Sequence, residues 1–260
     1  MTRANEDILS ELRIVIEACT AQVKWAGINA FEYLKAANDL VTSYPNLAAF
    51  SAICAEEEAA AALIHSVKTL RYPGAKKIKF TSHSHKHAVF FFVELAVGWY
   101  QSYQQTAEWP FRPLVLKFGL EGKRMAVHIV LPLKAVPLAV NPIPPLNLRV
   151  EGANTIESVL IDHMTEYLKT AEVDKVRTMI EKAAAYRNEL LYSSSKGLPV
   201  PKGDVDQFIT HQLEKVAILL TAVGLVDPWG KHPQAPIVTT CIALLVTFMD
   251  RTIPSSVSAS

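Results

Sequence analysis

Hydrophobic residues recur at helical spacing over most of the chain. Between Glu6 and about Val41 they fall every three or four positions, as on one face of an α-helix. Gly27 lies inside this stretch and marks either a break between two helices or a position within one. The same spacing predicts further helices at Leu47–Leu70, from a cap at Thr81 or Ser82 to about Gln105, and at Ile156–Lys169, Val173–Leu191, Val205–Val223 and Thr239–Arg251.

A different pattern occupies residues 110–150. Leu114–Leu120 and Met125–Leu131 are rich in Val, Leu and Phe and flank the turn signal Glu121-Gly122-Lys123-Arg124, which predicts a β-hairpin at 114–131. Five prolines between Pro132 and Pro145 exclude a regular helix, so we expect an extended Pro-rich arm there. The expected fold is mainly α: a helical bundle forming a single domain over 1–260, with the hairpin and the Pro-rich arm as an insertion at about 110–150.

Composition and charge exclude two broad classes of protein. Half of the residues are hydrophobic, which excludes an intrinsically disordered chain. The 26 Lys and Arg residues nearly balance the 25 Asp and Glu residues, and the net charge of +1 excludes a protein that coats nucleic acid through its overall charge. A local basic patch is still compatible with this balance.

The cysteines and the apolar stretches indicate the compartment. Three widely spaced cysteines cannot build a disulfide framework or a Cys-rich zinc site. The first seven residues include two acids and no apolar run, unlike a signal peptide. The stretches Ala88–Tyr100 and Ile237–Met249 are shorter than the about 20 residues that span a bilayer. We therefore expect a cytoplasmic protein without membrane contact.

Glu57 lies on an apolar stripe of the helix predicted at 47–70. The stripe consists of Ile53, Glu57, Ala60, Ile64 and Val67, spaced four or three positions apart. A carboxylate on such a face needs a partner, because burying an unpaired charge is costly. The alternative is that Glu57 and its neighbours Glu56 and Glu58 are all solvated.

Arg187 lies on a similar stripe near the end of the helix predicted at 173–191. The stripe consists of Ile180, Ala184, Arg187 and Leu191. An arginine that faces a glutamate across two helices forms a charge-assisted pair, and a guanidinium can also bind a phosphate. Asn188 beside it can donate and accept hydrogen bonds. The alternative is a surface arginine whose stem lies along the bundle.

The segment His83-Ser84-His85-Lys86-His87 allows two interpretations. His83 and His87 are four positions apart, a helical spacing that can hold a divalent metal, and a metal-dependent hydrolase would combine them with Glu57. However, no acid lies within the next turn, so we favour a basic surface that attracts phosphate, with no metal and no other cofactor. The candidate RNA-binding residues are Lys76, Lys77, Lys79, Lys86 and His87.

The order of these motifs resembles a known family. It comprises Cys54-Ala55-Glu56-Glu57-Glu58-Ala59-Ala60, then Ser84-His85-Lys86-His87, then Arg187-Asn188-Glu189-Leu190-Leu191-Tyr192 followed by Gly197 and Pro199. The motifs resemble the AbiV group of phage abortive-infection proteins, which is related to the HEPN superfamily. The resemblance covers roughly residues 47–105 and 155–223. It implies an all-α bundle that dimerises, with the arginine motifs of two subunits meeting in a cleft, and often a metal-independent ribonuclease.

This sequence departs from the HEPN pattern at one position. In HEPN nucleases a histidine follows the Arg-polar pair after four to six residues, whereas here Tyr192, Ser193 and Ser194 follow Arg187-Asn188. A tyrosine with an ordinary pKa of about 10 is a poor general base at neutral pH, although it can donate a hydrogen bond. Either the histidines at 83–87 supply the imidazole from another helix, or the site serves binding or regulation.

The resemblance therefore implies a homodimeric ribonuclease or toxin of antiviral defence that binds RNA and responds to a phage or host protein. The catalytic candidates are Arg187, Asn188, Tyr192, Glu57 and His85, with Glu57 orienting the arginine. The alternative is a non-catalytic helical interaction or regulatory subunit of a defence or toxin–antitoxin complex.

Overall fold

The computed structural model describes residues 3–106, 109–147, 155–170, 172–192, 199–226 and 234–253. In these ranges the chain is mainly helical with a small antiparallel sheet, as the sequence predicted. The helices are α1 (Arg3–Glu17), α2 (Ala21–Leu40), α3 (Pro45–Thr69), the 3₁₀ helix η1 (Ala75–Lys77), α4 (His83–Tyr103), α5 (Ile156–Tyr167), α6 (Glu172–Leu191), α7 (Val205–Val226) and α8 (Pro236–Thr252). The strands are β1 (Val115–Glu121), β2 (Arg124–Pro132) and β3 (Ala139–Val140).

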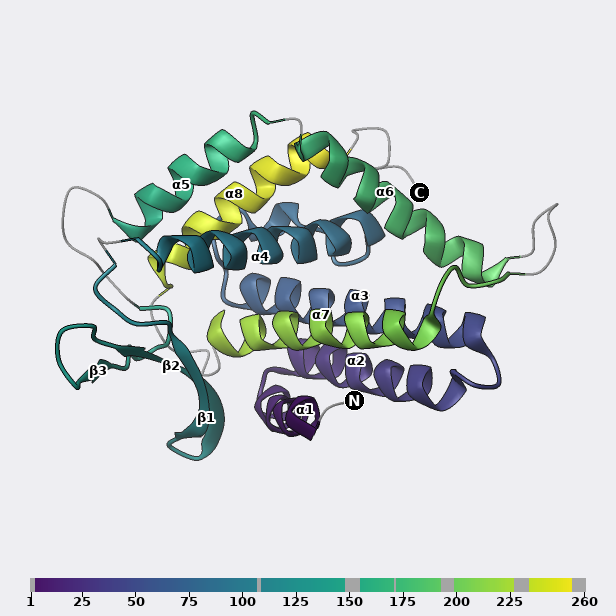
Figure 1. Cartoon of the computed structure of the whole chain (residues 1–260), viewed down its shortest axis with the longest axis horizontal. Coiled ribbons are helices and arrows are strands. Elements are labelled where there is room, and N and C mark those ends of the chain that lie inside the picture. Colours follow the sequence, from purple (N-terminus) through teal and green to yellow (C-terminus); the bar gives the residue numbers. More distant parts are fainter. Residues whose placement is uncertain are drawn as a thin grey trace.

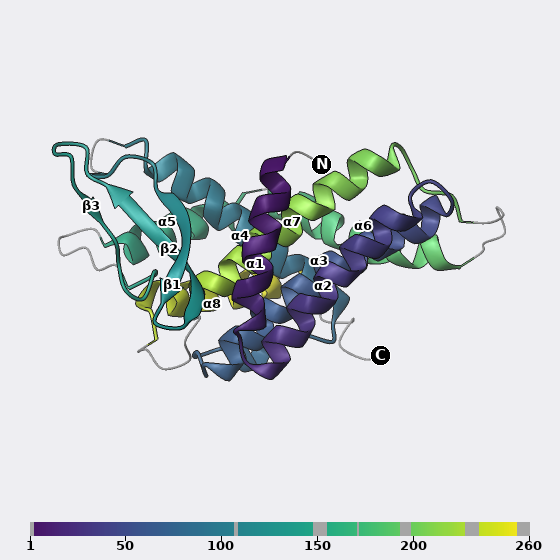
Figure 2. The ribbon, with the colours of Figure 1, turned by 90° about the horizontal axis from the view of Figure 1, so that it is seen from below.

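The helices are arranged in two layers (Figure 1). In one layer α2, α3 and α7 lie side by side and α1 crosses them, while α4, α5, α6 and α8 form the other. The sheet lies at one end of the bundle, where β2 contacts α1 and α7, as the second view shows (Figure 2). Helix α3 contacts α2 and α7 in its own layer and α4 and α6 in the other, so it is the central helix.

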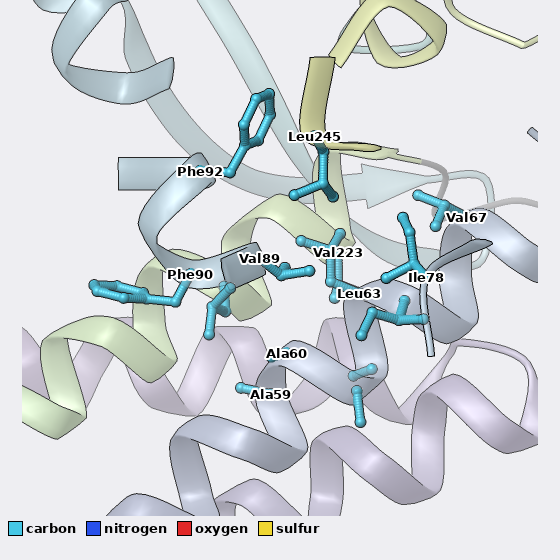
Figure 3. Close-up of a cluster of buried hydrophobic side chains, with 14 of the residues drawn as sticks. Ala59, Ala60, Leu63, Val67, Ile78, Val89, Phe90, Phe92, Val223 and Leu245 are labelled. Carbon is cyan, nitrogen blue, oxygen red and sulfur yellow. The ribbon is translucent and has the colours of Figure 1, made fainter. Parts of the chain in front are cut away.

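Helix α3 is buried around most of its circumference, because small side chains let its neighbours approach from several directions. Ala59 and Ala60 lie below the larger side chains of Leu63, Val89 and Val223 in the core (Figure 3). The apolar stripe predicted on α3 is buried, yet the opposite faces are buried as well. The prediction that α3 buries only one face is therefore wrong. Under that prediction Glu56 would lie outside the core, whereas it is buried.

One continuous hydrophobic cluster includes residues of all eight described α-helices and Val127 of β2. Helix α7 is long and apolar enough to cross a bilayer by length and composition, and it alone passes this test within the described ranges. In this structure it is a core helix, because Val216, Leu219 and Leu220 are completely buried. The cytoplasmic location expected from the sequence stays a prediction.

Gly27 lies within α2, and the break between the first two helices falls at residues 18–20. A Cβ atom at Gly27 would lie 2.5 Å from Cγ2 of Ile16, far inside van der Waals contact. The glycine therefore allows α1 and α2 to approach closely.

The predicted hairpin is present, with a shorter turn than expected. Glu121 pairs with Arg124, so the connection is the two-residue turn Gly122-Lys123, in which Gly122 has a φ of 61°. Only glycine adopts such a backbone without strain, which explains this residue at a tight turn. In the Pro-rich arm, the structure adds the short strand β3, whose Ala139 and Val140 pair with β2. The sequence did not predict β3, because a strand of two residues between prolines shows no alternating hydrophobic pattern.

Candidate functional site

Charged and imidazole side chains from four helices meet inside the bundle. We call this group the buried charge cluster. It consists of Glu56, Glu57 and Glu58 of α3, His83, Lys86 and His87 of α4, Arg187 of α6 and Lys215 of α7. Three carboxylates face two lysines and one arginine, so the charges balance when both imidazoles are neutral.

Local helical geometry explains how the cluster forms. Consecutive residues on a helix point about 100° apart, so the three glutamates of α3 turn toward different neighbouring helices. Helix α4 begins at His83, and its first turn is capped by Ser82, whose Oγ accepts a hydrogen bond from the amide of His85 at 3.4 Å. Positions 83, 86 and 87 then share one face of α4, and this face lies against the glutamates.

Glu56 is the most deeply enclosed acid of the cluster. Its Oε1 accepts a hydrogen bond from Nδ1 of His87 at 2.9 Å, and its Oε2 accepts one from Nζ of Lys215 at 3.0 Å. Burial by itself raises the pKa of Glu56, but the hydrogen bonds and charges of His87 and Lys215 outweigh it and hold the pKa at about 2. Nζ of Lys215 also lies 4.5 Å from the ring centre of Phe90. Glu56 is therefore ionised and ties α3 to α4 and α7.

Glu57 connects the interior of the cluster to its exposed edge. Its Oε1 lies 2.7 Å from Nδ1 of His83 and 3.5 Å from Nε of Arg187, and its Oε2 lies 3.9 Å from Nζ of Lys86. The Glu57 side chain is 4% exposed, whereas those of Arg187 and His83 are 23% and 43% exposed. One buried carboxylate thus holds an imidazole and a guanidinium that both reach solvent.

Arg187 is held by charge and by an aromatic ring. Its Cζ lies 5.1 Å from the ring centre of Phe50, a distance at which a cation is attracted to the ring face. Its buried Nε forms no aligned hydrogen bond, so the contact with Glu57 is an ion pair and not the bidentate pair that an arginine can form. The terminal nitrogens of the guanidinium are not committed to Glu57.

Glu58 and the second ring nitrogen of His87 complete the cluster. Glu58 accepts a hydrogen bond from Nδ2 of Asn29 on α2 at 3.1 Å and lies 3.6 Å from Nζ of Lys86. Nε2 of His87 is buried without a hydrogen-bond partner among the residues that the structure describes, and it lies 3.8 Å from Oε1 of Glu57. Cys54, one turn before Glu58, has its pKa raised to about 11, first by burial and then by Glu57, so its thiol is protonated at neutral pH.

The structure brings some of the predicted site residues together. Arg187 and Glu57 face each other as the two stripes predicted. Lys86 and His87 are buried against the glutamates, so they are not part of an exposed basic surface. Glu56 is buried as well, and the alternative of three solvated glutamates is wrong for it.

Other predicted residues lie elsewhere. The ring of His85 accepts a hydrogen bond from the amide of Lys79 at 3.1 Å, and burial, Lys79 and Lys68 lower its pKa. Asn188 is exposed on α6, and Tyr192 at the end of α6 is 68% exposed. Lys76, Lys77 and Lys79 are exposed on the connector between α3 and α4. Ser193, Ser194 and Gly197 lie outside the described residues.

Sequence reasoning missed Lys215 and Asn29 as partners of Glu56 and Glu58, and it combined His83 with Glu57 only as a possible metal-ligand set and not as a direct hydrogen-bond partner. Spacing could have indicated His83, because 83, 86 and 87 share a helical face that complements three consecutive acids. Lys215 follows Glu214 and has no acid three or four positions away on α7, so only the tertiary structure reveals its role.

The set His83, His87 and Glu57 does not form a metal centre within the described residues, where no group of three His, Cys, Asp or Glu side chains is arranged to hold an ion. The two Nδ1 atoms bind different glutamates, and Lys86 and Arg187 occupy positions beside the same carboxylates. His163 and His211 are exposed, and His211 lies 3.7 Å from Glu214, whereas Nδ1 of His128 is buried in β2 without a partner in the described part of the chain.

Comparisons of this chain with protein-family models, with curated proteins and with solved structures find no match. The resemblance to the AbiV group therefore rests on the motifs alone. Independently of it, the cluster offers an imidazole and a guanidinium on one carboxylate, an arrangement suited to proton transfer beside a bound phosphate.

Proposed function

We propose that this protein is a metal-independent ribonuclease of phage defence, HEPN-like in its bundle and dimeric, and that His83, Arg187 and Glu57 form its site. The observation that carries the proposal is that Oε1 of Glu57 lies 2.7 Å from Nδ1 of His83 and 3.5 Å from Nε of Arg187. The phage-defence role rests on the motif resemblance.

His83 supplies the proton transfer in this proposal. A carboxylate only accepts hydrogen bonds, so His83 donates its Nδ1–H to Glu57, and Nε2 of this half-exposed side chain is the proposed base. Imidazole is the side chain best suited to exchange protons near neutral pH. The histidine that HEPN nucleases carry after the Arg-polar pair thus has a counterpart on α4, in place of Tyr192 and His85.

The reaction is an internal transesterification of RNA. Nε2 of His83 takes the proton of a ribose 2′-hydroxyl, whose oxygen attacks the adjacent phosphorus. The bond to the 5′ oxygen breaks, that oxygen takes a proton from water, and the products carry a 2′,3′-cyclic phosphate and a 5′-hydroxyl. Arg187 holds the non-bridging oxygens and stabilises the charge that develops on them. Glu57 holds the imidazole of His83 and the guanidinium of Arg187 in fixed positions relative to each other.

The roles of the remaining candidates follow from their exposure. Asn188 and Tyr192 lie on the exposed side of α6 next to Arg187 and are proposed to contact RNA. Lys76, Lys77 and Lys79 are proposed to contact the phosphate backbone. His87 helps to hold the pKa of Glu56 low, Lys86 places a positive charge beside Glu57 and Glu58, and neither takes a direct part in the proposed reaction.

The test is cleavage of labelled RNA by the purified protein in EDTA, with detection of 2′,3′-cyclic phosphate ends, and sequencing of RNA ends in phage-challenged cells. His83→Asn and Arg187→Ala should each reduce cleavage about 100-fold or more, a typical contribution of a positioned acid–base or oxyanion-binding group. His85→Asn is the matched control, because it makes the same change two residues away on a ring bonded to Lys79. RNA ends that are identical for wild type and Arg187→Ala in both settings refute the proposal.

A non-catalytic interaction subunit is the second candidate, favoured by the surface of the insertion. Apolar side chains are exposed on the hairpin and the Pro-rich arm; they are Val115, Leu116, Leu120, Val136, Leu138, Val140 and Ile143. Exposed apolar groups gathered on one segment are typical of a partner surface. Purification from the native host followed by mass spectrometry would find a stoichiometric partner, and a homodimer without one would count against this candidate.

A further inference from the structure

A cavity of about 790 Å³ lies at the end of the bundle that carries the sheet. Its walls come from α4, α5, α7, α8, the end of α3, the segment 109–118, β2 and the Pro-rich arm, and Ile8 of α1 and Ile78 add to them. Leu63, Val89 and Leu245, which lie in the space between α3, α4 and α8 in Figure 3, belong to the wall, and so does Phe92. The volume falls in the range of small-molecule sites, about 300–1,000 Å³. It is separate from the buried charge cluster, whose side chains do not line it.

The chemistry of the wall is almost uniformly apolar. No Asp, Glu, Lys, Arg or His lines the cavity among the described residues. A charged ligand would lose its hydration there without gaining a counter-charge, which is strongly unfavourable. The body of the cavity therefore fits an uncharged apolar group.

Three polar atoms of the wall are buried without a hydrogen-bond partner within the described residues. They are the hydroxyl of Tyr100, Oε1 of Gln104 and Nε1 of Trp109. Tyr100 and Gln104 are one turn apart on α4, and the rings of Tyr100 and Trp109 lie 5.5 Å apart between centres, so the three residues gather at one end of the cavity. Buried polar groups in folded proteins are nearly always paired, so three unpaired groups in one wall point to a missing partner.

Their hydrogen-bonding roles define that partner. The indole N–H of Trp109 only donates, and Oε1 of Gln104 only accepts. Burial raises the pKa of Tyr100 to about 12, so its hydroxyl keeps its proton and can donate at neutral pH. A water could bridge these groups, but it would leave the apolar body of the cavity empty. A group that both accepts and donates satisfies all three, whereas a carboxylate leaves Gln104 unpaired.

We propose that this cavity binds a neutral amphiphile: an apolar chain or ring seated between α4, α7 and α8, with an alcohol or primary amide head bonded by Tyr100, Gln104 and Trp109. The head accepts from Trp109 and Tyr100 and donates to Gln104. The apolar body fills the space lined by Leu63, Phe92 and Leu245. This assignment does not depend on the ribonuclease proposal.

The test uses N-phenyl-1-naphthylamine, a neutral probe whose emission rises in apolar sites, on the full chain. Binding should saturate at one probe per chain and should quench tryptophan emission, since Trp99 and Trp109 line the cavity. 1-Decanol and decanamide should displace the probe at lower concentration than decanoate. Absence of saturable binding, or displacement by decanoate at the same concentration as 1-decanol, overturns the proposal.

Two tyrosine variants separate a specific head-group contact from general hydrophobic binding. Tyr100→Phe removes one hydroxyl from the wall and should weaken the binding of 1-decanol about threefold to tenfold, the usual contribution of one hydrogen bond. Decane should displace the probe at the same concentration as from the wild type. Tyr103→Phe is the matched control: Tyr103 packs on the same Trp109 ring but does not line the cavity. Equal effects of the two variants on 1-decanol, or none for Tyr100→Phe, refute the head-group assignment.

Discussion

Replacing Glu56 by glutamine tests whether the buried charge cluster stabilises the bundle as an ion pair. The pKa of Glu56 is about 2, against 4.5 for an ordinary glutamate, because His87 and Lys215 overcome the effect of burial. This difference corresponds to about 3 kcal/mol of folding stability at neutral pH. Glu56→Gln should lose most of it, because it removes the negative charge and replaces one of the two accepting oxygens by an NH2 group that cannot accept a hydrogen bond from His87 or Lys215.

The sign of the pH dependence follows from the lowered pKa. An acid whose pKa falls on folding stabilises the protein fully above its unfolded pKa of 4.5, and this contribution is lost as the pH falls toward 2. The difference in unfolding free energy between wild type and Glu56→Gln should therefore be largest above pH 5.5 and should shrink by about 1 kcal/mol by pH 3.5.

Urea denaturation followed by circular dichroism at pH 6.0, 4.5 and 3.5 measures this difference. Glu166→Gln is the control, because the Glu166 side chain is 73% exposed in its pair with Lys169 and should change stability by less than about 0.5 kcal/mol. Lys215→Met serves as a second probe: it removes one partner of Glu56 and should also destabilise the fold most at neutral pH. A wild-type advantage over Glu56→Gln that is the same at all three pH values would refute the reasoning.

Two further predictions concern packing and thiol chemistry. Gly224→Ala would place a Cβ 2.6 Å from Cγ2 of the buried Val127, so it should destabilise the protein by about 1–3 kcal/mol in thermal or urea unfolding, whereas Gly98→Ala, with nothing within 4 Å, should stabilise it by about 0.5–1 kcal/mol. Equal effects would contradict the close contact. Burial raises the pKa of Cys54 to about 11 and that of the half-buried Cys241 to about 12, so both thiols should react with Ellman's reagent at pH 8 only after denaturation. Rapid labelling of Cys54 in the native protein would contradict its burial, and rapid labelling of Cys241 would contradict its raised pKa.

Helix positions could be predicted from the sequence because apolar spacing and local signals agree. The helix predicted at Leu47–Leu70 is α3 at Pro45–Thr69, and Ser82 caps α4 as expected. The weaker signals failed: α8 begins three residues before the predicted Thr239, at Pro236, because the first turn of a helix accepts proline.

The candidate site was predictable only where two apolar stripes each carried one charge. That argument located Glu57 and Arg187, because an inward charge on each helix calls for a partner. It could not locate Glu56 or Lys215, since the alanines of α3 allow helices to pack on all its sides and no stripe distinguishes an inner face. The choice of His83 over His85 depends on the register of α4 against α3, which a single sequence does not encode locally.

The central claim is that Glu57 holds His83 and Arg187 as one catalytic unit. The most direct measurement is a double-mutant cycle on the rate of RNA cleavage in EDTA, with His83→Asn, Arg187→Ala and the double variant. If the two residues act on one phosphodiester, the double variant should cleave RNA hardly more slowly than either single variant, because each loss already disables the unit. Losses that multiply in the double variant, or single variants as active as the wild type, would contradict the claim.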